Sequence, residues 1–203
     1  KDGKNYKDLP NMVCFMGKME YMKMVAGVAA AMTTKTGKIG IVGGFPNKLM
    51  IRLLNMYEWG ARIGRPDLKA NRAYANSWSD VALGKQMAAS MADGGADVLF
   101  FYANQVGLGA IQAAKEKGIK FVGFAADQND IAPGTVVASV FFDFSNLYKW
   151  TVERFMAGGL KPVVNEVGIA EGIVRVTYTK DVKQSTRDLV AKAQKAIAEG
   201  SFL

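Results

Sequence analysis

Apolar positions along the chain alternate between helical and strand-like spacing. Between residues 18 and 32 they recur every three or four positions, which predicts a helix, and a short apolar run at 38–42 predicts a buried strand. The alternation continues with strands expected at 69–75, 97–101 and 119–124, and with helices expected to begin at Pro46, after an N-cap at Ser79, and at Gly107. Strands that alternate with helices predict right-handed βαβ units and an α/β fold with a parallel sheet.

The rhythm changes after Asp127. Strands are expected at 135–142 and 173–178, and helices at 147–156 and 181–198. The chain contains no internal repeat, low-complexity tract or long linker. A length of 203 residues is expected to form one domain or two small ones.

Composition and charge add little to this picture. Half of the residues are hydrophobic, which is ample for a packed core. The net charge of +8 comes from 26 Lys and Arg against 18 Asp and Glu, but the cations are dispersed, and we interpret them, Lys23 and Lys85 included, as an ordinary solvated surface. No nucleic-acid partner is expected, because no basic block is present.

Several classes of chemistry are excluded by residue type. The sequence has no histidine, and its one cysteine, Cys14, has no partner for a disulfide or a CxxC pair. It also lacks a GxGxxG fingerprint, a P-loop and an obvious pair of catalytic carboxylates. We therefore expect no catalytic residues, no metal site and no cofactor, and the protein is not expected to be an enzyme.

Membrane and export signals are not found within the chain. Its apolar stretch at 24–32 is far shorter than the roughly 20 residues that a spanning helix needs. The opening residues are too polar for a signal peptide, and the residues before Cys14 do not form a lipobox. Any export signal is therefore expected to lie upstream of Lys1 or never to have existed, and a lipid anchor, like the signal, would lie outside this chain.

An ordered set of short motifs resembles the basic membrane protein family of substrate-binding lipoproteins from ABC importers. The motifs are Pro10-Asn11, Ala26-Gly27-Val28-Ala29-Ala30, Thr34-Lys35-Thr36-Gly37-Lys38, Gly43-Gly44, Asn76-Ser77-Trp78-Ser79-Asp80, Gly95-Ala96-Asp97-Val98, Gly107-Leu108-Gly109, Asp127-Gln128 and Ala132-Pro133. The resemblance covers almost the whole chain and extends to the purine-nucleoside receptor of spirochaetes.

The resemblance implies a type I periplasmic-binding-protein fold, in which two Rossmann-like lobes with parallel sheets hold a ligand between them. In this chain the first lobe is expected to be incomplete. Residues 1–36 would be a remnant of the first lobe and residues 37–124 the second α/β lobe. Residues 125–203 would carry the hinge crossings with later segments of both lobes.

Candidate ligand-binding residues lie in the loops that follow the strands, because ligands of open α/β sheets bind beyond the carboxyl ends of the strands. The candidates combine aromatic rings, amides and a carboxylate, which suit a flat heterocycle: Phe45, Trp78, Phe100, Tyr102, Asn104, Gln105, Asp127 and Phe142. The resemblance places Phe100 where the nucleoside receptor stacks on its purine. It also places Ala125 and Phe142 where that receptor has an aspartate and a lysine for the ribose hydroxyls, which favours a free base over a nucleoside.

Several candidates also have a structural interpretation that the sequence leaves open. Phe100 is equally consistent with the core, Trp78 with packing at a hinge, and Phe45 with a hydrophobic staple before a helix. Asn104 is a common loop former, and Asp127 is compatible with a solvated hinge carboxylate.

The resulting expectation is an exported solute receptor that captures a purine-like or other heteroaromatic molecule and delivers it to an ABC permease. The alternative is a cytoplasmic ligand-sensing regulator built on the same binding fold.

Overall fold

The computed structural model describes residues 12–201, so the Pro10-Asn11 motif lies outside the described residues. Its main feature is a six-stranded sheet with the strand order β3-β2-β4-β5-β6-β8. The strands are β2 (Lys38–Gly43), β3 (Lys69–Tyr74), β4 (Val98–Tyr102), β5 (Lys120–Phe124), β6 (Val136–Phe142) and β8 (Val174–Tyr178). All neighbouring strands are parallel except β6 and β8, which are antiparallel.

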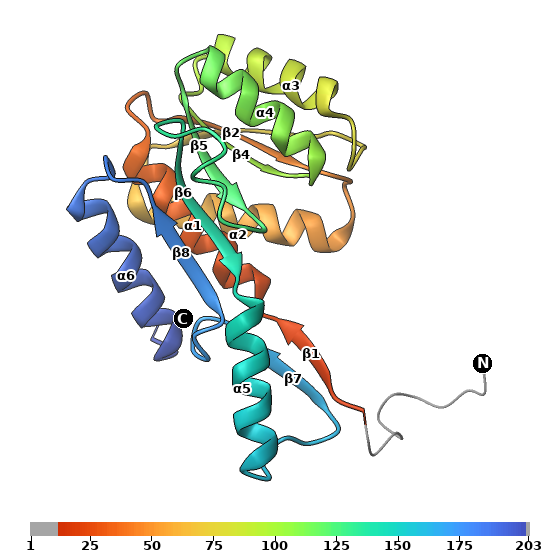
Figure 1. Cartoon of the computed structure of the whole chain (residues 1–203). Coiled ribbons are helices and arrows are strands. Elements are labelled where there is room, and N and C mark those ends of the chain that lie inside the picture. Colours follow the sequence, from red (N-terminus) through yellow and green to blue (C-terminus); the bar gives the residue numbers. More distant parts are fainter. Residues whose placement is uncertain (1–11, 202–203) are drawn as a thin grey trace.

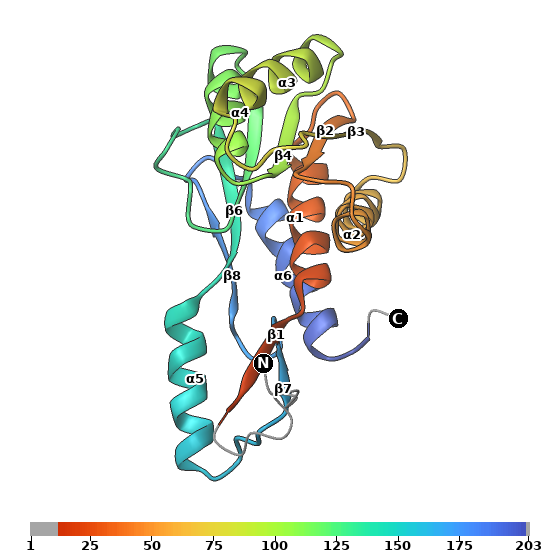
Figure 2. The same ribbon diagram turned by 90° about the vertical axis from the view of Figure 1, so that its right-hand side faces the viewer.

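Helices cover both faces of this sheet. One face carries α1 (Met19–Thr33), α2 (Lys48–Gly64) and α6 (Gln184–Ala198), and the other carries α3 (Val81–Asp93) and α4 (Gln105–Glu116) (Figures 1 and 2). Side chains alternate along β4 accordingly, so that Phe100 joins the core beneath α1 and Phe101 joins the core beneath α3 and α4. The α/β class expected from the sequence is confirmed.

Glycines allow the helices to pack closely in pairs. A Cβ on Gly27 would lie 2.0 Å from the Tyr57 carbonyl oxygen, and one on Gly60 would lie 2.0 Å from the Met24 carbonyl oxygen, so α1 and α2 are in backbone contact. A Cβ on Gly84 or on Gly109 would lie 1.9 Å from a carbonyl oxygen of the facing helix, so α3 and α4 are in backbone contact as well. Any larger residue at these positions would push the helices apart.

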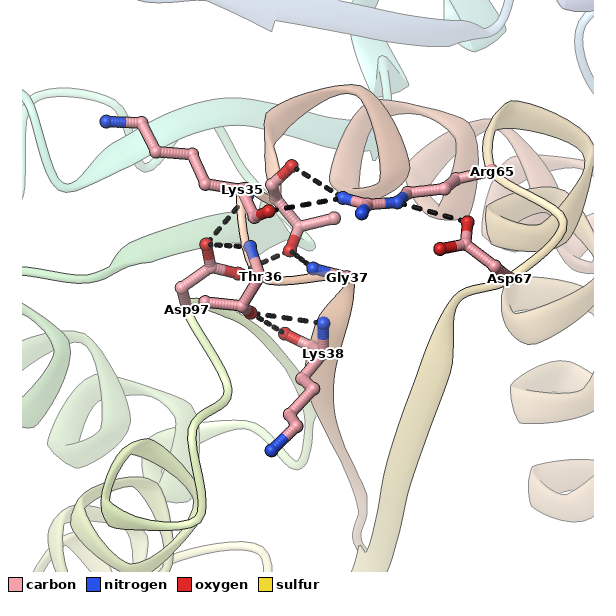
Figure 3. A network of polar contacts seen from close by, with 8 residues as sticks. Lys35, Thr36, Gly37, Lys38, Arg65, Asp67 and Asp97 are labelled. Atoms are coloured by element: carbon pink, nitrogen blue, oxygen red, sulfur yellow. Dashed lines mark hydrogen bonds and ion pairs between the residues drawn. The ribbon is translucent and has the colours of Figure 1, made fainter.

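A polar network fixes the turn between α1 and β2 at the amino-terminal edge of the sheet (Figure 3). The Asp97 carboxylate accepts hydrogen bonds from the Thr34 hydroxyl and from the backbone N–H groups of Lys35 and Thr36. Arg65 donates to the carbonyl oxygens of Thr34 and Lys35. Two of the motifs that carry the family resemblance, around Thr34 and Asp97, therefore form one structural contact.

A small unit extends from the carboxyl end of β6 (Figures 1 and 2). It consists of α5 (Phe144–Met156) and the parallel pair β1 (Cys14–Gly17) and β7 (Val164–Val167). None of the α5 residues is buried, and Phe144, Tyr148 and Phe155 are more than half exposed. This helix packs far less completely than the helices on the main sheet.

Most of the expected elements are observed within a few residues of their expected ends, but three details differ. The N-cap of α3 is Asp80 and not Ser79, because the Asp80 carboxylate accepts from Leu83 N–H at 2.9 Å. The Ser77 hydroxyl accepts from the N–H groups of Ser79 and Asp80 in the turn before the helix. Pro46 precedes α2, which is capped by Asn47. The sequence does not predict β1 and β7, because four residues are too few to show a clear strand pattern.

Helix α1, which belongs to the expected first-lobe remnant at residues 1–36, packs on α2 and against the sheet. The assignment of the individual segments to two lobes stays a prediction.

Candidate functional site

The loops at the carboxyl edge of the parallel strands are joined to one another by backbone hydrogen bonds. Gly44 N–H donates to the Tyr102 carbonyl oxygen at 3.0 Å, and Asn76 N–H donates to the Gly44 carbonyl oxygen at 2.7 Å. Gln105 N–H donates to the Trp78 carbonyl oxygen at 2.9 Å. The loops after β2, β3 and β4 therefore form one connected surface.

Backbone strain is concentrated at the same edge. Within the described residues, the non-glycine residues with positive φ are Asn76, Asn104 and Ala125, with φ of 51°, 47° and 74°. They follow β3, β4 and β5 closely. Such conformations cost about 1 to 3 kcal/mol each and cluster at ligand sites, where the surrounding structure holds them in place.

A cavity of about 250 Å³ opens between the loops after β4 and β5. Its lining combines aromatic and amide side chains with small residues, namely Phe101, Asn104, Gln105, Gly107, Leu108, Phe121, Phe124, Ala125 and Gln128. Two of the strained residues, Asn104 and Ala125, are among them. The cavity has apolar walls with a few polar groups that can orient a ligand.

A buried serine fixes the loop that forms one wall of this cavity. The Ser139 hydroxyl, on β6, accepts from Gln128 N–H at 3.0 Å and donates to the Asn129 side-chain oxygen at 3.1 Å. Gln128 in turn accepts from Phe124 N–H through its side-chain oxygen at 3.0 Å. This leaves the Gln128 amide nitrogen without a partner among the described residues, so it is free to donate to a ligand.

Aromatic rings extend along the edge in two pairs. The rings of Phe45 and Trp78, each 38% exposed, have centroids 5.8 Å apart. The rings of Tyr102 and Phe124 meet edge to face with centroids 4.5 Å apart, and burial raises the pKa of Tyr102. Of the two pairs, Phe45 and Trp78 are the more exposed and offer ring surface to a planar ligand.

Phe100 lies elsewhere. Its ring is fully buried and stacks on that of Tyr57 with centroids 4.3 Å apart and planes 18° from parallel. The ring therefore offers no exposed face, and the structure places this candidate in the core beneath the site. Tyr102, two residues further along the same strand, reaches the edge.

Two other candidates lie apart from the cavity that contains Asn104 and Gln105. Asp127 lines a separate, open hollow with Asp130, Tyr178 and Lys180. Phe142 ends β6, and its ring fills the space over Gly17, where a Cβ would lie 2.5 Å from it. This contact connects the main sheet to β1.

Lys23 is a residue whose environment the sequence analysis missed. Its side chain is fully buried on α1, so the interpretation of this lysine as part of the solvated surface is wrong. Burial lowers its pKa well below the ordinary value. The available signal was its position between Met22 and Met24 in a long apolar run.

The described residues contain no group of three or more acidic, cysteine or histidine side chains placed to hold a metal ion. Over the same residues, no helix combines the length and the hydropathy needed to cross a bilayer.

The chain is similar in sequence to known proteins. Residues 1–201 match the model of a family described as PnrA-like ABC transporter substrate-binding proteins. Basic membrane protein B of Borreliella burgdorferi is 31% identical over 193 residues, which are 90% of this chain and 56% of that protein. A purine-binding protein of Brucella abortus is 26% identical, over 97% of this chain and 56% of that protein.

Solved structures show the same fold. A solute-binding protein of an ABC transporter system from Conexibacter woesei superposes with a TM-score of 0.80 at 16% identity, covering 96% of this chain and 65% of that one. A transcriptional activator of the comK gene from Bacillus halodurans gives 0.84 at 20% identity, covering 95% of this chain and 67% of that one.

The chain spans about half the length of the curated relatives that it matches. The fold class is that of type I periplasmic solute-binding proteins, of which this chain covers a part. Because the family model matches almost every residue, the chain belongs to the family of PnrA-like substrate-binding proteins of ABC transporters.

Proposed function

We propose that this protein is the solute receptor of an ABC importer and that it binds a purine-like heterocycle at the carboxyl edge of its sheet. The observation that carries the proposal is the cavity between the loops after β4 and β5, where Phe124 lies with Asn104, Gln105 and Gln128. An aromatic ring stacks on a planar ligand, and amides donate to and accept from the polar edge of a heterocycle. The purine-binding relative from Brucella abortus supports the same ligand class.

The proposed receptor is exported and delivers its ligand to a permease. Closure of two lobes around the ligand would create the shape that the permease recognises. Trp78, Phe45 and Tyr102 would then contact the ligand from the loops that are joined at this edge, whereas Asp127 and Phe142 would act at the hinge.

A cytoplasmic regulator that senses a small molecule is the second candidate function. It is favoured by one observation, the superposition on a transcriptional activator over 95% of this chain. A signal peptide with a lipobox upstream of Lys1 would support the receptor, and a DNA-binding domain would support the regulator. Turnover of the bound compound would contradict both.

The test is ligand binding by the protein expressed from its complete gene. Native mass spectrometry of freshly purified material reports any co-purified small molecule, and calorimetry with adenine, xanthine and the matching nucleosides then measures affinity. We expect Gln105→Ala, at the cavity, to weaken binding, and Gln112→Ala, further along the same helix, to leave it unchanged. Tighter binding of nucleosides than of bases would reject the preference for a free base.

A further inference from the structure

Lys23 carries a buried nitrogen with no acceptor. Its Nζ atom has no hydrogen-bond partner among the described residues, and none of their ion pairs includes it. It is instead surrounded by aromatic rings, with its Nζ atom 3.0 Å from the centroid of Phe124, 3.9 Å from that of Tyr102 and 5.6 Å from that of Phe100.

Aromatic faces do not fully satisfy such a group. A ring attracts a cation with about 0.5 to 2 kcal/mol, but the amine or ammonium keeps donors that only oxygen or nitrogen acceptors satisfy well. A buried donor without an acceptor costs about 1 to 3 kcal/mol. The Tyr57 hydroxyl, whose ring stacks on Phe100, is a second buried donor without a partner in this region.

The rings around Lys23 connect it to the candidate site. Phe124 is in contact with the Lys23 nitrogen and also lines the cavity that contains Asn104 and Gln105. Tyr102 ends β4, immediately before the strained loop of that cavity. Both rings are only partly buried and end their strands at the carboxyl edge of the sheet, so a ligand would reach the nitrogen by displacing them.

We propose that Lys23 is a specificity-determining residue that selects ligands carrying an anionic or carbonyl oxygen. The inference rests on the proposed function, because it assigns the recognised group within that same site. An oxygen on the ligand supplies the acceptor that the Lys23 nitrogen lacks, and an anionic oxygen also stabilises its protonated form. A ligand edge that presents only an amino group would place a donor against a donor. Adenine accepts only through its ring nitrogens, whereas oxo-purines add oxygen acceptors and ionise to anions, so oxo-purines are expected to be preferred.

The experiment compares urate and xanthine with adenine by titration calorimetry, using the protein expressed from its complete gene. Lys23→Met removes the nitrogen and keeps a flexible side chain of similar length, and Lys23→Gln is the second variant should the first fail to fold. Lys115→Met, at an exposed lysine on α4, is the matched control. Circular dichroism establishes that each variant is folded.

We expect Lys23→Met to bind urate and xanthine about tenfold or more weakly, to lose the preference for them over adenine, and to bind adenine like the wild type. The control should keep the wild-type order. A folded Lys23 variant with the wild-type order of affinities would overturn the inference and leave the proposed function intact. A wild type that binds neither the oxo-purines nor adenine would overturn both the inference and the proposed function.

Discussion

The Phe100 ring stacks on the Tyr57 ring with centroids 4.3 Å apart, and both side chains are fully buried between the sheet and α2. Phe100→Ala is therefore expected to lower the free energy of unfolding by about 3 to 5 kcal/mol, because it removes a large core ring and leaves a cavity. Urea unfolding measures this loss. Phe45→Ala, at a ring that is 38% exposed, is the control and should cost much less. Equal losses for the two variants would contradict the assignment of Phe100 to the core.

Substitution of Trp78 should affect ligand affinity more than stability. Its ring packs over Gly44 yet stays 38% exposed at the connected edge of the sheet. Trp78→Ala is expected to weaken heterocycle binding by about 1 to 3 kcal/mol, the usual range for loss of base stacking on an aromatic ring, and to cost less stability than Phe100→Ala. Calorimetry measures the affinity. Trp59→Ala, at a 45% exposed tryptophan on α2, should leave the affinity unchanged. A Trp78 variant that binds like the wild type would remove this residue from the site.

Lys23→Met is expected to stabilise the protein by about 1 to 3 kcal/mol at pH 7, because it removes an unpaired buried donor. The gain should depend on pH. Burial lowers the pKa of Lys23 in the folded state, so the unfolded chain binds this proton more tightly and wild-type stability rises with pH until the unfolded value of about 10.4 is reached. The advantage of the variant should therefore shrink as the pH rises.

Urea unfolding at a series of pH values checks this, with Lys115→Met as the control that should show no such trend. A variant that is less stable than the wild type at neutral pH would show that the aromatic rings fully compensate for the buried nitrogen.

Asp97→Asn is expected to loosen the turn between α1 and β2. One carboxylate oxygen accepts from the Thr34 hydroxyl and the other from Lys35 and Thr36 N–H. Asparagine has a single acceptor oxygen, so at least one of these bonds is lost, at a cost of about 1 to 3 kcal/mol. Burial opposes ionisation of Asp97, but the hydrogen bonds from Thr34, Thr36 and Lys35 outweigh it and lower the pKa of Asp97.

That lowered pKa means that the stabilising contribution of Asp97 is present above its unfolded value of about 3.9 and is lost as the pH falls through the folded value. Thermal melts between neutral and acid pH should therefore show a smaller acid-induced loss for Asp97→Asn. Asp93→Asn, which breaks an exposed pair with Lys117, should cost little at neutral pH. An unchanged acid dependence in Asp97→Asn would contradict this role.

Gly60→Ala is expected to separate α1 from α2. The added Cβ would lie 2.0 Å from the Met24 carbonyl oxygen, and relief of that overlap requires movement of the backbone, at a cost of about 1 to 3 kcal/mol or more. Gly94→Ala, where the nearest atom would be 3.4 Å away, is the control. Differential scanning calorimetry of both variants measures the effect, and equal melting temperatures would mean that the two helices can move apart freely.

Hydrophobic periodicity alone determined the order of most helices and strands, because each of these elements is long enough to show its own spacing of apolar residues in the sequence. It also placed Phe100 and Phe101 on opposite faces of β4, which follows from the alternation of side chains along a strand. From the order of the βαβ units, the sequence further indicated which loops share the carboxyl edge of the sheet. The sequence did not predict β1 and β7, because each strand is too short to show a pattern. Their pairing, which sets Cys14 beside Val164, joins parts of the chain that are far apart in sequence.

Tertiary structure alone decided which side chains of that edge are accessible. Phe100 is covered because Tyr57, from a different helix, lies on it, and Asp127 lies in a different hollow from Asn104 because the loop after β5 is held by Ser139 on β6. Lys23 is the clearest case. A lysine on an amphipathic helix ordinarily reaches solvent, and only the packing of α1 against the ends of β4 and β5 encloses its nitrogen among aromatic rings.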